Sequence, residues 1–211
     1  MTAISEKCVR DALDSTNLNG ATFPWPQRFS AGQFLKRWIA LPITVDLRLV
    51  ADDEHRKLAI AAIDEVELHL KPVGLPRALF MFGGLSVGEP GLVFSFGTAA
   101  APEKVPQKHN CGNVSAGPHS TAYPPGFLKL TGEISAQFFI NVGSPHNDGC
   151  KPSRDIAIHE IGHALGLGDH FQGFGEGPII SDLFWCVLET LYANPIGPVP
   201  ASSKLTYHLT P

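Results

Sequence analysis

The chain has 211 residues, 44% of them hydrophobic and 17% charged, which is enough apolar material for the core of one globular domain. The formal charge of −4 excludes a broad cationic surface of the kind that binds nucleic acid. No apolar run approaches the roughly 20 residues that cross a bilayer, and residues 1–10 lack the apolar stretch of a signal peptide. We therefore expect a monomer with neither a nucleic-acid nor a membrane partner.

The N-terminal residues 1–33 predict a short helix over 4–14 and then an irregular arm, because Gly and Pro interrupt the segment that follows. The compact fold is expected to begin near Phe34. Five apolar residues alternating with polar ones predict a half-buried strand over 41–50. An apolar stripe with acidic residues opposite then predicts a helix over 53–70, ended by Pro72 and Gly74.

Two short apolar runs, 78–82 and 92–96, predict strands joined by a Gly-rich loop. Residues 99–125 are rich in Gly, Pro, Asn and Ser without periodicity, and they predict the longest loop of the domain. Residues 127–130 and 133–142 predict a hairpin around Thr131-Gly132. A helix over about 181–192 follows the motif described below, and the Pro-rich tail 194–211 is expected to cross the surface as an extended strap.

Four cysteines allow three pairings, and their spacing selects none of them. Cys111 and Cys150 both lie in loop-type sequence, so a disulfide between these loops fits an oxidising compartment. Cys186 lies in an apolar run and predicts a buried thiol. No pair has CxxC spacing, which argues against a cysteine zinc site.

The segment around residue 160 carries the chemistry. Ser153 is a candidate N-cap for a helix over about 154–166. His159 and His163 are four residues apart and therefore lie on one face of that helix, where both imidazoles can reach one metal ion. Glu160 follows the first histidine, so its carboxylate can lie beside a water on the metal without being a ligand, in the position of a general base.

A third ligand is expected just after the helix. Gly166 can take the left-handed conformation that ends a helix and turns the chain back, and Gly168 adds freedom to the same turn. Asp169 comes ten residues after His159, and His170 follows it. Either side chain could complete the site.

The pattern His159-Glu160-x-x-His163-x-x-Gly166 resembles the active-site signature of the metzincin clan of zinc metallopeptidases, and residues 159–167 are similar to its matrixin version. Most of that clan has histidine where this chain has Asp169. The run from Gly166 to His170 is instead similar to the snapalysin group of small bacterial proteases, in which an aspartate is the third zinc ligand. The resemblance implies a Zn²⁺ site of His159, His163 and Asp169, with His170 as the alternative, which would need a one-residue bulge at Gly168.

The resemblance also implies an α+β fold over roughly residues 37–192, within a catalytic domain of residues 34–193. Its sheet is expected to be twisted and mostly parallel, with an antiparallel edge strand, a zinc helix and a C-terminal helix. One of the strands 92–96 or 134–140 is expected to be the edge that pairs with an extended substrate. The clan has a methionine turn beneath the zinc, where this chain offers Ile180. Members are usually secreted, which implies an extracellular location.

These features predict a hydrolase, a zinc metalloendopeptidase that cleaves protein or peptide substrates with a zinc-activated water and Glu160 as base. One alternative is a zinc-containing peptide-binding module with little or no proteolytic activity. Another is a purely structural helix in a protein that binds a different ligand through its long Gly- and Pro-rich loop. Of the other histidines, His55 and His69 are expected to be solvated, and three in loops near cysteines are candidates for a second, structural metal: His109, His119 and His146.

Overall fold

A five-stranded sheet forms the centre of the computed structural model, which describes residues 3–18, 34–75, 77–97, 111–118, 126–129, 131–144, 150–177, 179–199 and 204–209. In order across the sheet, the strands are β3 (Phe80–Phe82), β2 (Ile43–Asp46), β4 (Gly91–Phe96), β6 (Gln137–Val142) and β5 (Gly112–Ser115). β5 is antiparallel to β6, and the other neighbours are parallel. A mixed fold of helices and a mostly parallel sheet with an antiparallel edge is therefore confirmed.

The antiparallel edge strand lies elsewhere than predicted. β5 falls within residues 99–125, where the sequence predicted a loop, and both strands proposed for the edge, β4 and β6, are central. β5 escapes detection because two of its four buried residues, Asn113 and Ser115, are polar. The side-chain amide of Asn141 on β6 donates to the Asn113 carbonyl (3.2 Å) and to the Ser115 hydroxyl (2.9 Å). Cross-strand hydrogen bonds thus replace the apolar pattern that would reveal a strand.

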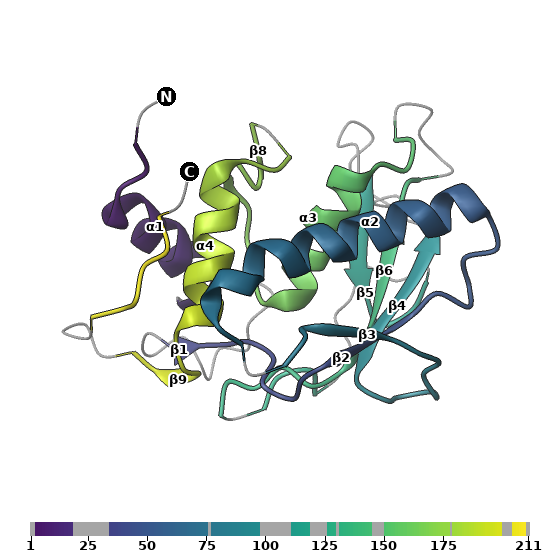
Figure 1. Ribbon diagram of the computed structural model, residues 1–211, viewed down its shortest axis with the longest axis horizontal. Helices are drawn as coiled ribbons and strands as arrows, with labels where there is room; N and C mark the ends of the chain where they lie inside the picture. The colour runs from purple at the N-terminus through teal and green to yellow at the C-terminus, as the bar shows by residue number, and fades with distance from the viewer. Residues whose placement is uncertain are drawn as a thin grey trace.

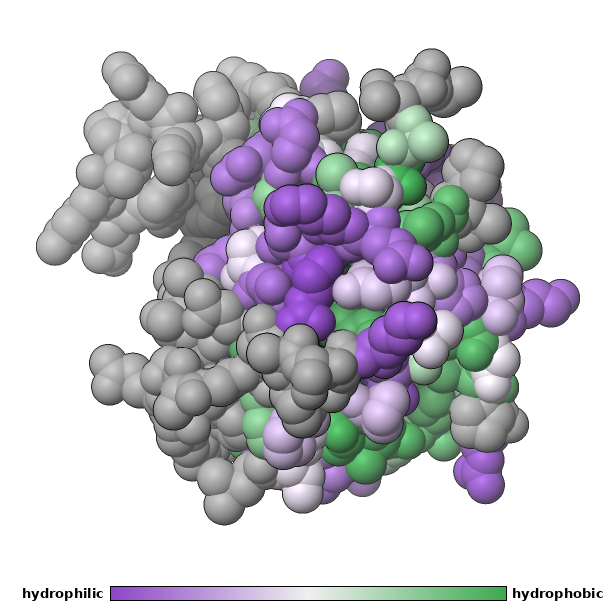
Figure 2. All heavy atoms as spheres, turned by 90° about the vertical axis from the view of Figure 1, so that its left-hand side faces the viewer, coloured by the Kyte–Doolittle hydropathy of each residue, from purple (hydrophilic) through white to green (hydrophobic). Residues whose placement is uncertain are grey.

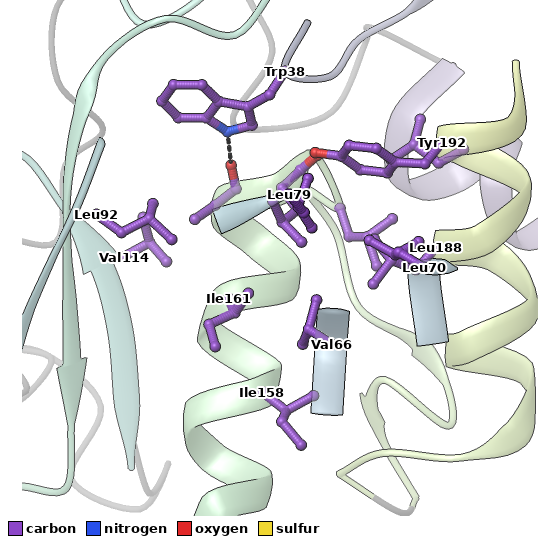
Figure 3. Close-up of a cluster of buried hydrophobic side chains, with 14 of the residues drawn as sticks. Trp38, Val66, Leu70, Leu79, Leu92, Val114, Ile158, Ile161, Leu188 and Tyr192 are labelled. Carbon is purple, nitrogen blue, oxygen red and sulfur yellow. Dashed lines mark hydrogen bonds between the residues drawn. The ribbon is translucent and has the colours of Figure 1, made fainter. Parts of the chain in front are cut away.

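Two helices lie side by side over one face of the sheet (Figure 1). α2 (Asp53–Leu70) has the predicted bounds and buries the predicted stripe, and α3 (Arg154–Leu165) contacts both α2 and strands β5 and β6. Figure 3 shows Ile161 of α3 directed toward the sheet and Ile158 on the side of Val66 of α2. Burial on both sides of α3 gives the helix one fixed position.

The N-terminal segment belongs to the same core. α1 (Glu6–Leu13) and the π-helical turn η1 (Asp14–Leu18) bury Val9, Leu13 and Leu18 completely. α1 packs against α4 (Asp182–Ala193), and the two lie together at one end of the molecule (Figure 1). Figure 2 views that end, where described hydrophilic side chains cover the middle of the surface. The expectation that the compact fold begins near Phe34 was wrong, and the arm over 19–33 lies outside the described residues.

The described part of the C-terminal tail is bonded to the last turn of α4 and to the residue that follows it. β9 (Gly197–Pro198) pairs with β1 (Phe34–Leu35), and residues 204–209 have no regular secondary structure. Asn194 and Thr206 exchange side-chain and backbone hydrogen bonds of 2.9 Å. The tail is therefore tied to the C-terminal end of the helix.

The first predicted strand is shorter than its alternating pattern. β2 ends at Asp46, whose buried carboxylate accepts hydrogen bonds from the backbone of Arg48 (2.9 Å) and Leu85 (3.0 Å). The Arg48 guanidinium lowers the pKa of Asp46 to about 2, so this carboxylate is charged. The chain turns at residues 48–49, directly after the strand, and Leu49 is exposed.

The cysteines follow the prediction. Cys111 and Cys150 form a disulfide with Cα atoms 4.8 Å apart, and Cys186 is a buried thiol whose pKa burial raises to about 11. The disulfide joins the residue before β5 to the segment that leads into α3. In the described ranges no helix has both the length and the apolar character of a bilayer span.

Replacing Cys111 and Cys150 together by serine is expected to lower the free energy of unfolding. The bond closes a sequence separation of 39 residues, and a loop of that size removes about 4 kcal/mol of chain entropy from the unfolded state. Urea unfolding under non-reducing conditions measures the loss. Cys8→Ser removes an exposed free thiol and is the matched control, with no expected change. Equal midpoints for the double variant and the parent would contradict the prediction.

Candidate metal centre

The site is built on α3, and both ends of this helix are set by local sequence. The Ser153 side chain accepts a hydrogen bond from Ile156 N, which caps the N-terminus as expected. Gly166 ends the helix with a φ of 123°. A Cβ at Gly166 would lie only 2.7 Å from the carbonyl oxygen of Lys36. Both the backbone angle and the close approach require glycine, so the helix stops here and the chain turns.

Three histidines converge around this turn. His159 and His163, on one face of α3 as expected, have their Nε2 atoms 3.1 Å apart. Nε2 of His170 lies 3.1 Å from that of His159 and 3.2 Å from that of His163. Among the described residues, these three make up the one group of three or more histidine, cysteine or acidic side chains that could hold a metal ion. Burial decreases along the set, from the buried His159 to the exposed His170.

The triangle of nitrogens fits a small divalent ion. Zinc–nitrogen bonds of about 2.0–2.1 Å at tetrahedral angles place ligand nitrogens about 3.3 Å apart. The observed separations of 3.1–3.2 Å are close to that value. A neutral imidazole has only one N–H, so three rings cannot satisfy three mutual contacts by hydrogen bonding. The donor set is therefore suited to a cation, and three imidazoles leave a fourth position of zinc for water or substrate.

The outer nitrogens decide which ring atom faces the ion. Nδ1 of His163 donates to the carbonyl oxygen of Leu167 at 2.6 Å, which leaves its Nε2 unprotonated. Nδ1 of His159 is buried and has no hydrogen-bond partner of ordinary geometry among the described residues. The nearby backbone of Ile179 raises the pKa of this ring, but by less than burial lowers it. Burial is the main cause of a pKa well below the usual value for His159 and of about 4 for His163. Both rings are therefore neutral, the form that binds metal.

Asp169, the first choice for the third ligand, does not lie in this cluster. The residue is half-buried, and its backbone carbonyl accepts a hydrogen bond of 2.7 Å from the Thr16 hydroxyl. His170, the alternative, supplies the third nitrogen. The geometry thus favours three histidines over two histidines and an aspartate.

An aromatic ring lies against the three histidines, where the sequence predicted an aliphatic side chain. Phe174 has no exposed surface, and the distances from its ring centroid to those of His159, His163 and His170 are 4.4, 4.8 and 5.7 Å. Ile180, expected to replace the methionine, is half-buried and forms a single β-bridge with Phe174. The apolar support of the imidazoles is therefore Phe174. No sequence signal marked it beyond its position in the turn-rich segment after the motif.

Glycines let the layers around the histidines approach closely. A Cβ on Gly162 of α3 would lie 2.8 Å from the ring of Phe184 and 3.1 Å from that of Phe174. Gly175 begins the short strand β8 (Gly175–Glu176), which pairs with β7 (Phe171–Gln172). A Cβ on Gly175 would lie 2.7 Å from the His170 ring and 2.9 Å from the His159 ring. Larger side chains at these two positions would displace the imidazoles or their support.

Glu160 lies beside the histidines at a cleft of about 190 Å³. Residues at the start of β5, on α3 and in the segment after it line the cleft: Cys111, Gly112, Ile156, His159, Glu160, His170, Gly175 and Ile179. The edge strand β5 approaches the Glu160 carboxylate closely at Gly112. A Cβ added at this glycine would lie only 2.6 Å from Oε1 of Glu160. Burial raises the pKa of Glu160 to about 8. In the absence of a cation this carboxyl group holds its proton at neutral pH.

Two further described histidines pack against aromatic rings instead of joining the cluster. His69 is not simply solvated, since its ring stacks on Trp185 at 3.8 Å and its Nδ1 lies 3.3 Å from Glu189 Oε1. His55 stacks on Phe96 at 4.7 Å. The three histidines considered for a second metal lie outside the described residues: His109, His119 and His146.

No model of a known protein family matches the chain, and a search of curated proteins likewise finds no significant match. The chemistry of the site therefore has to be inferred from its own residues.

Substitution of the two candidate third ligands distinguishes them. His170→Ala is expected to lower zinc affinity by more than about a hundredfold. Loss of a residue that only hydrogen-bonds to a metal ligand usually costs about ten- to a hundredfold, and loss of a ligand itself should cost more. Asp169→Asn keeps the backbone carbonyl that Thr16 contacts and is expected to have a much smaller effect. Competition with a chromophoric chelator at neutral pH gives both affinities. The reverse order of losses would return the ligand role to Asp169.

The buried carboxyl group also predicts a pH dependence of metal-free stability. Glu160 has a pKa of about 8 when folded and about 4.5 when unfolded, so between these values the folded state binds more protons and stability falls as pH rises. Each unit of difference corresponds to about 1.4 kcal/mol. Glu160→Gln lacks this slope, whereas the histidines titrate in both proteins. Urea unfolding of metal-free protein from pH 5 to 8 should show the variant gaining stability relative to the parent. Parallel profiles would rule out the shifted carboxyl pKa.

Proposed function

We propose that this chain is a zinc-dependent metalloendopeptidase of the metzincin type. The observation that carries the proposal is the convergence of three imidazole nitrogens, 3.1–3.2 Å from one another, at a cleft that also contains Glu160. A general base next to a three-histidine set with an open coordination position is the arrangement expected for metal-assisted hydrolysis.

A zinc ion held by His159, His163 and His170 would lower the pKa of a coordinated water toward neutrality and polarise the scissile carbonyl group. Glu160 accepts the proton of the attacking water and passes it to the leaving amine. Its buried position makes it a stronger base than an exposed carboxylate, consistent with a pKa raised by desolvation. The Leu167 carbonyl keeps the proton of His163 on Nδ1 and so holds that ring in its ligand form.

The edge strand supports a peptide as the substrate. β5 is the last strand of the sheet, and Cys111 and Gly112 at its beginning line the cleft next to Glu160. A sheet edge can pair with an extended peptide through its backbone, and such a peptide would lie along β5 with a peptide bond near the histidines. An extended polypeptide therefore fits the cleft better than a compact small molecule.

A zinc-containing peptide-binding module without turnover is the second candidate. It was motivated by an aspartate ligand and by the absence of a methionine beneath the zinc. The first motive loses weight because His170, and not Asp169, lies with the other two histidines. The Cys111–Cys150 disulfide supports an oxidising, extracellular location as part of the proposal.

Glu160→Gln tests the proposal directly. Removal of a general base is expected to lower kcat by about 10²–10⁴ while zinc stays bound. Cleavage of casein and of a quenched peptide, with zinc content from elemental analysis, gives both quantities. Glu54→Gln changes an exposed carboxylate of α2 and is the matched control, with unchanged turnover. Equal turnover for Glu160→Gln and the parent would exclude Glu160 as the base, and a zinc-loaded parent without cleavage would favour the binding module.

A further inference from the structure

The end of α3 is held by side chains from distant parts of the chain. Nε1 of Trp38 donates to the carbonyl oxygen of Ala164 at 2.8 Å, the bond drawn in Figure 3. The Tyr192 hydroxyl donates to the carbonyl oxygen of Leu165 at 3.2 Å. The last carbonyl groups of a helix have no partner within it, so these two bonds complete the helix end. The turn over 166–169, which leads to His170, needs other partners.

Thr16 and Asn17, at the end of the N-terminal segment, supply them. The Thr16 hydroxyl donates to the carbonyl oxygen of Asp169 at 2.7 Å, and its own carbonyl accepts from Gly168 N at 2.8 Å. The side-chain amide of Asn17 donates to the carbonyl oxygen of Gly166 at 2.7 Å. Three of the four residues of the turn are therefore bonded to two consecutive residues near the start of the chain.

This contact is closed to solvent. Thr16, Asn17 and Lys36 each have 0% of their surface exposed. The Asn17 amide also donates to the carbonyl oxygen of Lys36 (2.7 Å), its side-chain oxygen accepts from Lys36 N (3.0 Å), and the Lys36 ammonium donates to the Asn17 carbonyl. Buried polar groups left without partners cost free energy. The network therefore favours a single arrangement of the turn.

Two of the three imidazoles depend on that arrangement. The carbonyl held by Thr16 belongs to the peptide unit that leads into His170. His163 donates from Nδ1 to the carbonyl oxygen of Leu167, within the same turn. Gly166, with its φ of 123°, provides a backbone conformation that the local sequence does not lock. The direction in which His170 leaves the turn is thus fixed from outside it.

We propose that Thr16 and Asn17 are positioning residues of the metal centre, through which the N-terminal segment 3–18 sets the metal affinity. The inference rests on the proposed zinc site. Its physical basis is preorganisation, because ligands held within about 0.5 Å of the binding geometry need little ordering when the ion binds. Neither residue supplies a ligand atom. Their loss weakens binding and leaves the three imidazoles in the chain.

Thr16→Val tests this inference with little change of shape, because it exchanges the hydroxyl group for a methyl group. It is expected to weaken zinc binding by roughly ten- to a hundredfold, the loss typical of residues that orient metal ligands. Thr16→Ser keeps the donor and is expected to bind zinc nearly as tightly as the parent. Asn17→Asp keeps the oxygen that Lys36 N contacts, removes the donor to Gly166, and is a second test with the same expected direction. Chelator competition on the full chain measures each affinity.

The control is Thr190→Val. Thr190 has 0% exposed surface, and its hydroxyl accepts from His208 N at 3.1 Å, so its loss affects the C-terminal tail. The melting temperature of metal-free Thr190→Val should fall, and the zinc affinity of this variant should equal that of the parent. If Thr16→Val and Asn17→Asp fold and bind zinc as tightly as the parent, the inference is overturned and the proposed function stands. A parent chain that binds no zinc would overturn both.

Discussion

Three imidazole nitrogens, each 3.1–3.2 Å from the other two, form the contact on which the structure around the site depends. Hydrogen bonds between the rings cannot satisfy all three contacts, because each neutral imidazole has only one N–H. The fold holds the three rings together. Helical spacing places His159 and His163 on one face, Phe174 packs against the rings, and the turn at Gly166 returns the chain so that His170 lies beside them. A cation between the nitrogens would convert this strained contact into a stabilising one.

Desolvation prepares both halves of the chemistry. Burial lowers the pKa values of His159 and His163, so that their nitrogens are free to bind, and it raises the pKa of Glu160, so that the carboxylate is a strong base once it is ionised. A divalent ion would stabilise the ionised carboxylate beside it. Under the proposed function, metal binding would relieve the free-energy cost of burying these groups, and it would couple the stability of the protein to pH and to the metal.

Segments far apart in the sequence form the walls of the site. The edge strand β5 lies against Glu160 through Gly112, and the adjacent disulfide ties it to the segment before α3. On another side, β8 approaches two of the histidines through Gly175. The N-terminal segment closes the turn after α3 from the protein interior. The site is therefore a product of the whole domain, although its signature occupies only twelve residues.

Local periodicity and capping signals were enough to predict α2 over 53–70, α3 between Ser153 and Gly166, and the common face of His159 and His163. Helix spacing and glycine conformation are properties of neighbouring residues, so they can be derived without the fold. The three-dimensional fold was needed to show that β5 is the edge strand, that Phe174 packs on the histidines, and that His170 lies with them instead of Asp169. These outcomes depend on contacts between residues far apart in sequence, which no local pattern encodes. The bonds from Asn141 to β5 span 28 and 26 residues, and those from Asn17 and Thr16 to the turn before His170 span 149 and 153.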